Sequence, residues 1–436
     1  MMVMRTIDLR GKKLTKGEYQ KLLPRANFSV ADAVTKINPI LERVKNGDQA
    51  ELIALCQEFD GVKPKSIRVA DDELAKALQK IPKDVMHSLQ VAIDQVRRFH
   101  QTQLPQEIAT EVLPGGQIDR RWVALDRVGL YVPGGIATYP SSVIMNVVPA
   151  QIAGVKSIAI ASPPQKNNDG LPSEIILATC KLLGVNEVYA IGGAQAIAMF
   201  GYGVTGVCEA VNLITGPGNI YVAAAKRALR GLVGIDSEAG PTEILILADK
   251  NANPNDVAAD LISQAEHDEL AAAILVTDSQ ALIDQVLPLV DKRSAATKHS
   301  KRVRSSLAGQ QSAVILVDSI DQGVMVVNAY APEHLEIMVT NSEIIAKQIN
   351  NAGAIFLNRF SPVSLGDYAA GSNHVLPTGG CACHSSGLSV NTFMRNISVI
   401  NYNQTAFNQV AQDVITLAHA EDLPAHAEAI LVRLEN

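Results

Sequence analysis

The 436-residue sequence is poor in cysteine, aromatic residues and histidine, with 5 Cys, 4% aromatic residues and 9 His. A small, odd number of cysteines gives a chain of this length no disulfide framework and indicates a reducing compartment. The net charge is −6 and no basic stripe with interleaved aromatic residues is present, which argues against a nucleic-acid partner. We therefore expect neither a disulfide-rich secreted protein nor a nucleic-acid-binding protein.

Long hydrophobic runs are also missing. No apolar stretch is long enough to span a bilayer, so we expect no membrane partner. The first residues soon reach Asp8, Arg10 and Lys12 and contain no apolar core of a secretory signal, which makes the cytoplasm the expected location. The content of 47% hydrophobic and 19% charged residues is typical of a globular protein, with roughly two to four domains at this length.

Residues 1–126 are expected to form a helical N-terminal part. Apolar residues recur at spacings of three and four in 30–44 and 71–102, as on one face of a helix. A short helix is predicted at 16–23, where Pro24 ends it.

Two α/β units are expected to follow in tandem, at 127–235 and 236–378. Short, continuous apolar segments such as 128–132 and 244–248 alternate with helical stretches such as 141–154. Strands of this kind are typical of sheets covered by helices on both faces, and the alternation predicts parallel strands with crossover helices.

The remainder, 379–436, is expected to be a loop and a helical tail. The segment 366–387 is rich in Gly, Ser, Asn and Cys and is predicted to be a long loop, which in a compact enzyme is usually functional. The predicted fold is thus α/β, with two tandem incomplete Rossmann-like parallel-sheet units between helical N-terminal and C-terminal parts.

Two histidines directly follow an acid, in Glu266-His267 and Glu333-His334. Gln264 and His267 are three residues apart at the end of a predicted helix, so their side chains share a face. With a carboxylate from Asp367 and an imidazole from His426, they would form an N/O ligand set suited to zinc or a similar metal. From spacing alone, a polar helix end with a solvated histidine is the more common outcome.

Glu333-His334 follows Pro332 at the start of a predicted strand. The two side chains can act as water activator and base if both point into a pocket. The alternative is a capping glutamate beside a surface histidine. The sequence Cys381-Ala382-Cys383-His384 lacks a second cysteine pair, so we interpret it as part of a loop and not as a structural zinc site.

Glycine-rich turns follow several predicted strands, at 133–135, 192–193 and 216–219. Turns of this kind bring backbone N–H groups close to a phosphate. None completes the dinucleotide fingerprint G-x-G-x-x-G, so any NAD site would be a non-standard one. Taken singly, each is more often an ordinary strand-to-helix turn.

Together these motifs resemble those of the histidinol dehydrogenase family, from about Ile7 to the C-terminus. The matching segments are GLYVPGG at 129–135, GGAQAIA at 192–198, GPGN at 216–219, IDSEAGPTE at 235–243, DLISQAEH at 260–267, PEHL at 332–335 and GDYAAGSNHVLP at 366–377. The resemblance implies a zinc- and NAD-dependent, four-electron oxidation of L-histidinol to L-histidine through L-histidinaldehyde, in the last steps of histidine biosynthesis.

The resemblance also implies roles for individual residues. It makes Glu333 and His334 the catalytic acid/base pair. The implied ligands of one zinc ion per subunit are Gln264, His267, Asp367 and His426. The residues expected to line the histidinol site are Thr242, Gln264, His267, His334, Asp367, Glu421 and His426, and those expected to contact NAD are Tyr131, Gln195 and Asn219. Thr242 stands where the family often has serine, which keeps the hydroxyl and adds a methyl group.

The family forms homodimers, and by analogy Glu421 and His426 would enter the partner subunit's site. Three alternatives remain open. A relative could oxidise another small amino- or sulfo-alcohol, with the difference expected near Glu421 and Thr242. A zinc hydrolase could use Glu333 without any need for NAD-facing turns. A non-catalytic binding protein would leave the clustered ligands and acid/base residues as a coincidence.

Overall fold

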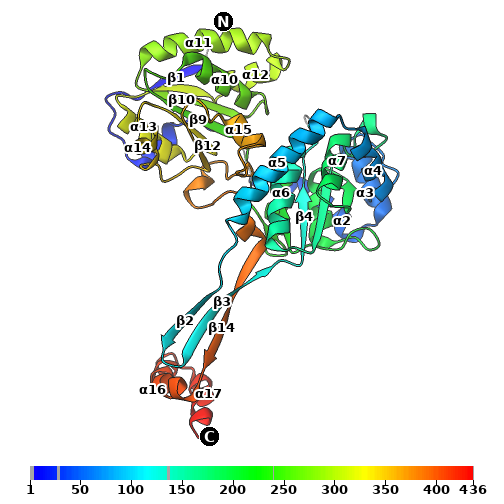
Figure 1. Ribbon diagram of the computed structural model, residues 1–436, viewed down its shortest axis with the longest axis vertical. Helices are drawn as coiled ribbons and strands as arrows, with labels where there is room; N and C mark the ends of the chain where they lie inside the picture. The colour runs from blue at the N-terminus through cyan, green and yellow to red at the C-terminus, as the bar shows by residue number, and fades with distance from the viewer. Residues whose placement is uncertain (1–3, 27–29, 135–137, 239, 436) are drawn as a thin grey trace.

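The computed structural model describes residues 4–26, 30–134, 138–238 and 240–435. Two parallel sheets, each packed between helices, lie side by side, and a long arm extends away from both (Figure 1). The arm consists of an antiparallel sheet with two helices at its far end. In these ranges no helix is both long and apolar enough to cross a membrane.

Sheet A has the strand order β1-β11-β10-β9-β12-β13, and all its neighbouring strands are parallel. Its strands are β1 (Arg5–Asp8), β9 (Glu243–Ala248), β10 (Ala272–Thr277), β11 (Ala313–Leu316), β12 (His334–Met338) and β13 (Ala354–Leu357). Side chains alternate between its faces, so Ile244 and Leu245 belong to different cores. One face packs against α10 (Pro254–Ala265), α11 (Gln280–Ala296) and α12 (Ser300–Ala308), and the other against α1 (Lys16–Leu22), α13 (Ile320–Tyr330) and α14 (Ser342–Ala346).

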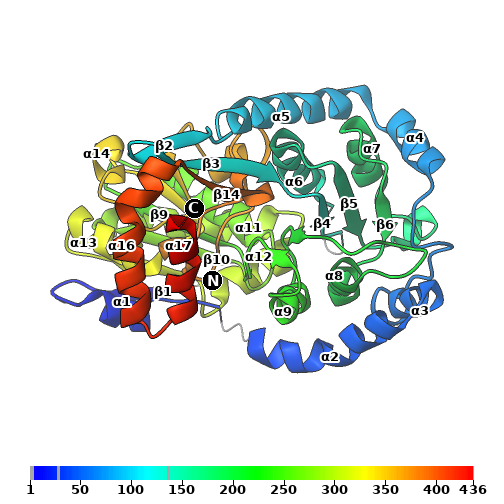
Figure 2. The same cartoon turned by 90° about the horizontal axis from the view of Figure 1, so that it is seen from below.

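Sheet B has the order β6-β5-β4-β7-β8 and is also parallel. Its strands are β4 (Arg127–Tyr131), β5 (Ser157–Ser162), β6 (Val188–Ala190), β7 (Leu213–Thr215) and β8 (Gly234–Ile235). The helices on one face are α6 (Pro140–Ala153) and α7 (Glu174–Leu182), covered by α4 (Asp71–Lys80) and α5 (Lys83–Gln101). Those on the other are α8 (Gly193–Tyr202) and α9 (Ile220–Leu229), covered by α2 (Val30–Asn46) and α3 (Gln49–Phe59). Figure 2 shows α2 to α5 curving around sheet B.

Both sheets have one topology. If the strands of each unit are counted in chain order from β4 and from β9, each sheet reads 3-2-1-4-5, and β1 adds a further edge strand to sheet A. This is the doubly wound Rossmann order without its sixth strand. The predicted class, α/β with two tandem incomplete Rossmann-like units, is confirmed.

The arm is built from segments far apart in sequence. Strands β2 (Ile108–Leu113), β3 (Gly116–Ala124) and β14 (Met394–Tyr402) form an antiparallel sheet in the order β14-β3-β2. Helices α16 (Gln404–Ala420) and α17 (Pro424–Leu434) pack together at its end, around Ile415, Ala418 and Ala427 (Figure 1).

Several local predictions were wrong. The part expected to be helical up to residue 126 contains β1 and the β2–β3 hairpin, and the expected C-terminal loop and helical tail contains β14. Most residues of β2 and β14 are exposed, so these strands lack the continuous apolar run that marks a buried one. The stretch expected to be helical over 71–102 forms two helices, α4 and α5, separated at Ile81 and Pro82.

Candidate functional site

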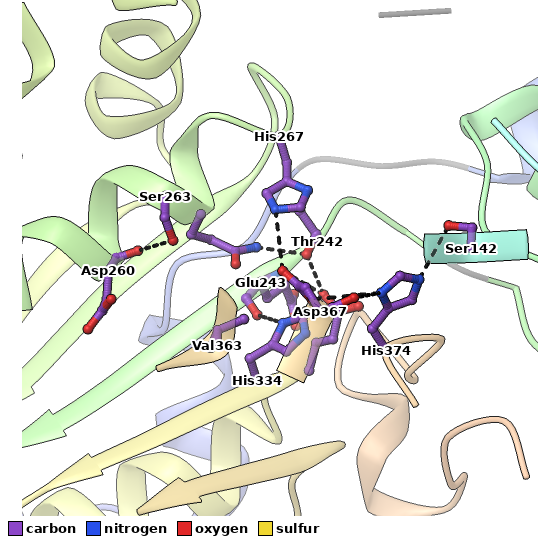
Figure 3. A network of polar contacts seen from close by, with 12 residues as sticks. Ser142, Thr242, Glu243, Asp260, Ser263, His267, His334, Val363, Asp367 and His374 are labelled. Carbon is purple, nitrogen blue, oxygen red and sulfur yellow. Dashed lines mark hydrogen bonds and ion pairs between the residues drawn. The ribbon is translucent and has the colours of Figure 1, made fainter. Parts of the chain in front are cut away.

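The predicted acid/base residues lie at the amino edge of sheet A. Thr242 immediately precedes β9, Glu333 precedes β12, and His334 is the first residue of β12, which pairs with β9. Helix α13 ends at Tyr330, and the next residue, Ala331, adopts the left-handed conformation before Pro332. Figure 3 shows Thr242, His334 and the predicted metal ligands His267 and Asp367 pointing toward one another.

The metal-ligand candidates come from two helix ends. Gln264 lies in the last turn of α10, which ends at Ala265, so His267 lies beyond the helix and not on it as expected. A turn holds it there, since its N–H donates to the carbonyl of Gln264 over 3.2 Å. Asp367 lies on α15 (Val363–Tyr368), inside a segment that was predicted to be a loop.

His334 is buried and held by one ring nitrogen. Nδ1 is 3.0 Å from the carbonyl oxygen of Glu243, a contact that needs a proton on Nδ1. In the neutral ring, Nε2 then carries the free lone pair. Among the described residues Nε2 has no hydrogen-bond partner although it is buried, so it is available to a bound molecule.

Glu333 is held by one carboxylate oxygen. Its Oε2 accepts hydrogen bonds from the hydroxyl of Thr242 over 2.7 Å and from the backbone N–H of Glu243 over 2.9 Å, and lies 3.4 Å from Nδ1 of His334. Burial raises the pKa of the Glu333 carboxyl, while His334 and these hydrogen bonds oppose the rise. A carboxylate with a raised pKa is a better proton acceptor than an exposed one.

The same hydroxyl fixes the orientation of Gln264. Because Thr242 donates its proton to Glu333, it can only accept from the side-chain amide of Gln264, whose Nε2 lies 2.7 Å away. The carbonyl oxygen Oε1 of Gln264 is therefore turned away from Thr242. An amide oxygen is an acceptable ligand for a divalent cation.

The residues fit a zinc site that is incomplete within one chain. Nε2 of His267 and Oδ2 of Asp367 lie 4.0 Å apart, too far for a hydrogen bond but within two zinc–ligand bonds of about 2.0–2.2 Å each. Together with Oε1 of Gln264 they offer one nitrogen and two oxygens. In the described parts of the chain, no three His, Cys, Asp or Glu side chains gather closely enough to hold a metal ion.

His426 and Glu421 do not join this cluster within one chain. Both are exposed, His426 on α17 and Glu421 at the end of α16, at the far end of the arm (Figure 1). The structure thus brings together three of the four predicted zinc ligands and leaves the fourth on a surface that extends away from the site.

The predicted NAD contacts lie at the carboxyl edge of sheet B. Tyr131 ends β4, and its hydroxyl accepts a hydrogen bond of 3.1 Å from the N–H of Gly193 at the start of α8. Gln195, also on α8, is buried, whereas the exposed Asn219 caps α9. In the glycine-rich turn at 133–135, Gly135 falls outside the described residues. The switch point between β4 and β7 is where doubly wound sheets bind nucleotides, so this edge fits a dinucleotide.

Comparison with known proteins identifies the family. The family model described as histidinol dehydrogenase matches residues 23–434. The chain belongs to the histidinol dehydrogenase family. The histidinol dehydrogenases of Thermobifida fusca and Streptomyces avermitilis are 57% and 55% identical to it, over 99% and 98% of this chain and 98% and 97% of theirs. The crystal structure of histidinol dehydrogenase from Elizabethkingia anophelis matches with a TM-score of 0.92 at 34% identity, covering 99% of this chain and 98% of that one.

As a member of the histidinol dehydrogenase family the protein is an oxidoreductase. Its site contains a histidine that sequence analysis did not select. Nδ1 of His374 donates to the backbone carbonyl of Asp367 over 3.1 Å, and its Nε2 lies 3.3 Å from the hydroxyl of Ser142 on α6 (Figure 3). It therefore links the two sheet units beside a candidate metal ligand. The available signal was its position in the same Gly-, Ser- and Asn-rich segment as Asp367.

Proposed function

We propose that this protein catalyses the zinc- and NAD-dependent, four-electron oxidation of L-histidinol to L-histidine through L-histidinaldehyde, in the last steps of histidine biosynthesis. Family membership supports the substrate. The observation that carries the chemistry is the buried His334, which is oriented through Nδ1 while Nε2 faces no partner among the described residues. All five cysteines are free, which supports the proposed cytoplasmic location.

In the first oxidation, Nε2 of His334 accepts the proton of the substrate hydroxyl. The carbonyl of Glu243 holds the ring in the required tautomer, so no reorientation is needed before proton transfer. The positive charge that forms on the ring is stabilised by Oε2 of Glu333, 3.4 Å from Nδ1. His334 then releases the proton to solvent before the second oxidation.

In the second oxidation, Glu333 accepts a proton from the water that adds to the aldehyde carbon. The hydrogen bonds from Thr242 and Glu243 both end on Oε2, which leaves Oε1 to face the water. Nε2 of His334 then accepts the hydroxyl proton of the hydrate as that carbon is oxidised to the carboxylate.

Gln264, His267 and Asp367 would hold the zinc ion with His426, and Tyr131, Gln195 and Asn219 would contact NAD. When bound, zinc would orient the alcohol carbon of the substrate, and NAD would take up one hydride in each oxidation. Thr242 and Asp367, with Glu421, would complete the histidinol site. Replacing His267 by Asn should remove the metal, which elemental analysis of the purified protein would reveal.

We infer further that the active unit is a homodimer whose sites are shared. The arm exposes large apolar side chains, among them Ile400 at 69% and Leu417 at 63%, and such exposure is typical of an interface. An arm that reaches a second subunit would bring Glu421 and His426 to that subunit's site. His426 would be the fourth zinc ligand there, beside Gln264, His267 and Asp367. Mixed dimers of an inactive His334 variant with an inactive His426 variant should regain activity, and no recovery after proven subunit exchange would contradict sharing.

The overall reaction is tested by its stoichiometry. A limiting amount of L-histidinol, with zinc and excess NAD, should yield two NADH per substrate molecule, and a chelator should abolish the signal. One NADH would mean that the chain stops at the aldehyde and that the role given to Glu333 is wrong. No NADH from a folded, metal-loaded sample would mean that the substrate is a different alcohol.

A further inference from the structure

Glu243 holds the proposed acid/base pair through its backbone. Its N–H donates to Oε2 of Glu333, and its carbonyl accepts from Nδ1 of His334. One peptide segment at the start of β9 therefore orients both groups. Any shift of this segment would move the carboxylate and the imidazole together.

The side chain of Glu243 points to the face of sheet A opposite that of His334, because His334 pairs with Ile244 and side chains alternate along β9. Its Oε1 forms an ion pair of 2.7 Å with Nη1 of Arg25, and only 6% of the Glu243 side chain is exposed. Burial raises the pKa of Glu243 to about 7, and the positive charge of Arg25 opposes this rise. Without Arg25, the buried carboxylate next to Glu333 would lose its counter-charge.

Arg25 also holds the segment that leads to the acid/base pair. Its Nη2 donates to the backbone carbonyl of Tyr330, and its guanidinium lies over the buried Tyr330 ring, 4.0 Å from the centroid. Tyr330 is the last residue of α13, where a cation interacts favourably with the helix dipole. Three residues later the chain reaches Glu333.

A single guanidinium therefore contacts both segments that meet at the site: the start of β9 through Glu243 and the end of α13 through Tyr330. Lysine could not reproduce this, because its point charge lacks the planar fork that reaches two acceptors at once. The tyrosine ring and the ion pair restrict the rotation of the arginine, so both segments are held in one relative position.

We propose that Arg25 and Glu243 are positioning residues, which act from behind sheet A to fix the orientation of Glu333 and His334. The inference rests on the proposed function, because it assumes that Glu333 and His334 perform the proton transfers.

The test is the kinetics of an Arg25→Ala variant of the zinc-loaded enzyme. A misplaced base acts on the chemical step, so kcat should fall about 10–100-fold, as for other outer-shell partners of a reactive group. KM for L-histidinol and zinc content should change little, because the substrate and metal contacts are intact. Added guanidinium should restore part of kcat, since the Arg25 side chain is 29% exposed, and urea at equal concentration should not.

A double-mutant cycle separates positioning from general destabilisation. If Arg25 acts through Glu243, its replacement should cost much less kcat in a Glu243→Gln background than in the wild type. Arg10→Ala is the matched control: this arginine of the same N-terminal segment is exposed and pairs with Asp8, and its loss should leave kcat unchanged.

An unchanged kcat in Arg25→Ala would overturn the proposal, and so would a loss that appears only in KM or zinc content. Additive effects of Arg25→Ala and Glu243→Gln on kcat, without rescue by guanidinium, would also overturn it. A parallel His334→Asn variant distinguishes failure of the proposed function from failure of the positioning role. Normal turnover in His334→Asn refutes the proposed function itself. Inactivity of His334→Asn beside a normal Arg25→Ala variant refutes only the positioning role.

Discussion

Sheets A and B share one strand order, yet the candidate site uses opposite edges of them. Sheet B contributes its carboxyl edge, with Tyr131 and the turns at Gly193 and Gly216. Sheet A contributes its amino edge, with Thr242 before β9 and His334 at the start of β12. In open α/β sheets ligands usually bind at the carboxyl ends of the strands, so the proposed NAD edge of sheet B would follow this rule and the proposed catalytic edge of sheet A would depart from it.

Helix polarity explains the difference. Helices α6, α8 and α9 begin at the carboxyl edge of sheet B, and helix N-termini attract anions such as a pyrophosphate. Helices α10 and α13 end at the amino edge of sheet A, and helix C-termini favour cations. The guanidinium of Arg25 at Tyr330 suits this edge, and the proposed metal ion near Gln264 would suit it too. The shared topology thus gives each sheet one edge that favours anionic ligands and one edge that favours cations. Sheet B turns its anion-favouring edge toward the candidate site, and sheet A turns its cation-favouring edge.

The carboxyl edge of sheet A carries acids instead of glycine turns. Asp249, Asp278 and Asp318 follow the ends of β9, β10 and β11. Carboxylates there would repel a pyrophosphate. Sequence chemistry, and not strand order, decides which edge can bind a nucleotide.

The largest expected effect is at the amino edge of sheet A. His334→Asn should lower kcat about 10²–10⁴-fold, because the proposed general base is lost. Zinc content and NAD affinity should stay normal, since neither involves Nε2 of His334. Steady-state kinetics, elemental analysis and NAD titration would check this. A variant that turns over normally would remove the amino edge from the chemistry.

At the carboxyl edge of sheet B, Gly216→Ala should weaken NAD binding. Gly216 has a φ of +113°, and a Cβ there would lie 2.0 Å from the carbonyl oxygen of Tyr131. Backbone strain of this kind costs about 1–3 kcal/mol, and relief would displace the turn. NAD titration should show reduced affinity with normal zinc content.

Gly206→Ala is the control for Gly216→Ala. Gly206 also has a positive φ, of +74°, but nothing lies within 4 Å of its Cβ position. The Gly206→Ala variant should lose some stability without a change in NAD affinity. Equal NAD affinity in the wild type and Gly216→Ala would argue that this turn lies outside the nucleotide site.

Sheet A also has a buried acid whose proton should make stability depend on pH. Burial, followed by repulsion from Asp260, raises the pKa of Glu336 from 4.5 to about 9, and its Oε1 accepts the N–H of Val363. The folded state therefore keeps a proton that the unfolded state loses, so the free energy of unfolding falls as pH rises from about 5 to 9.

Glu336→Gln should flatten this dependence, because the amide stays neutral at all these pH values. Urea unfolding of both proteins at pH 6 and pH 8.5 would measure the change. Parallel curves for the wild type and Glu336→Gln would show that Glu336 does not retain its proton. Glu343→Gln, at an exposed position of α14, is a control that should leave the pH dependence as in the wild type.

The smallest effect is expected at the carboxyl edge of sheet A. Oδ2 of Asp249 accepts hydrogen bonds from the N–H and hydroxyl of Thr340, at 2.8 and 2.7 Å. Asp249→Ala should lower stability by roughly 1 kcal/mol and leave kcat and NAD affinity unchanged. A clear loss of NAD affinity would mean that this edge also binds the nucleotide and that the contrast between the sheets is false.

Local chemistry made the sheets and part of the site predictable. Continuous apolar strands such as β9 indicated burial on both faces. The adjacency of Glu333 and His334 in the sequence predicted an acid/base pair, which stays a prediction. The exposed arm strands gave no such pattern. The contact of Arg25 with Glu243 joins residues 218 apart, and nothing in either local sequence points to the other. His374 was missed because its partners are backbone and hydroxyl groups brought in by the fold.

Because β1 pairs with β11, sheet A cannot be completed until late in the translation of the chain. Residues 5–8 cannot join their neighbours until residues 313–316 have been translated, and the whole of sheet B emerges in between. We expect sheet B to gain protease resistance on the nascent chain well before sheet A does. The segment that carries Arg25 is thus among the first to be made, yet its partner Tyr330 is translated only after β11.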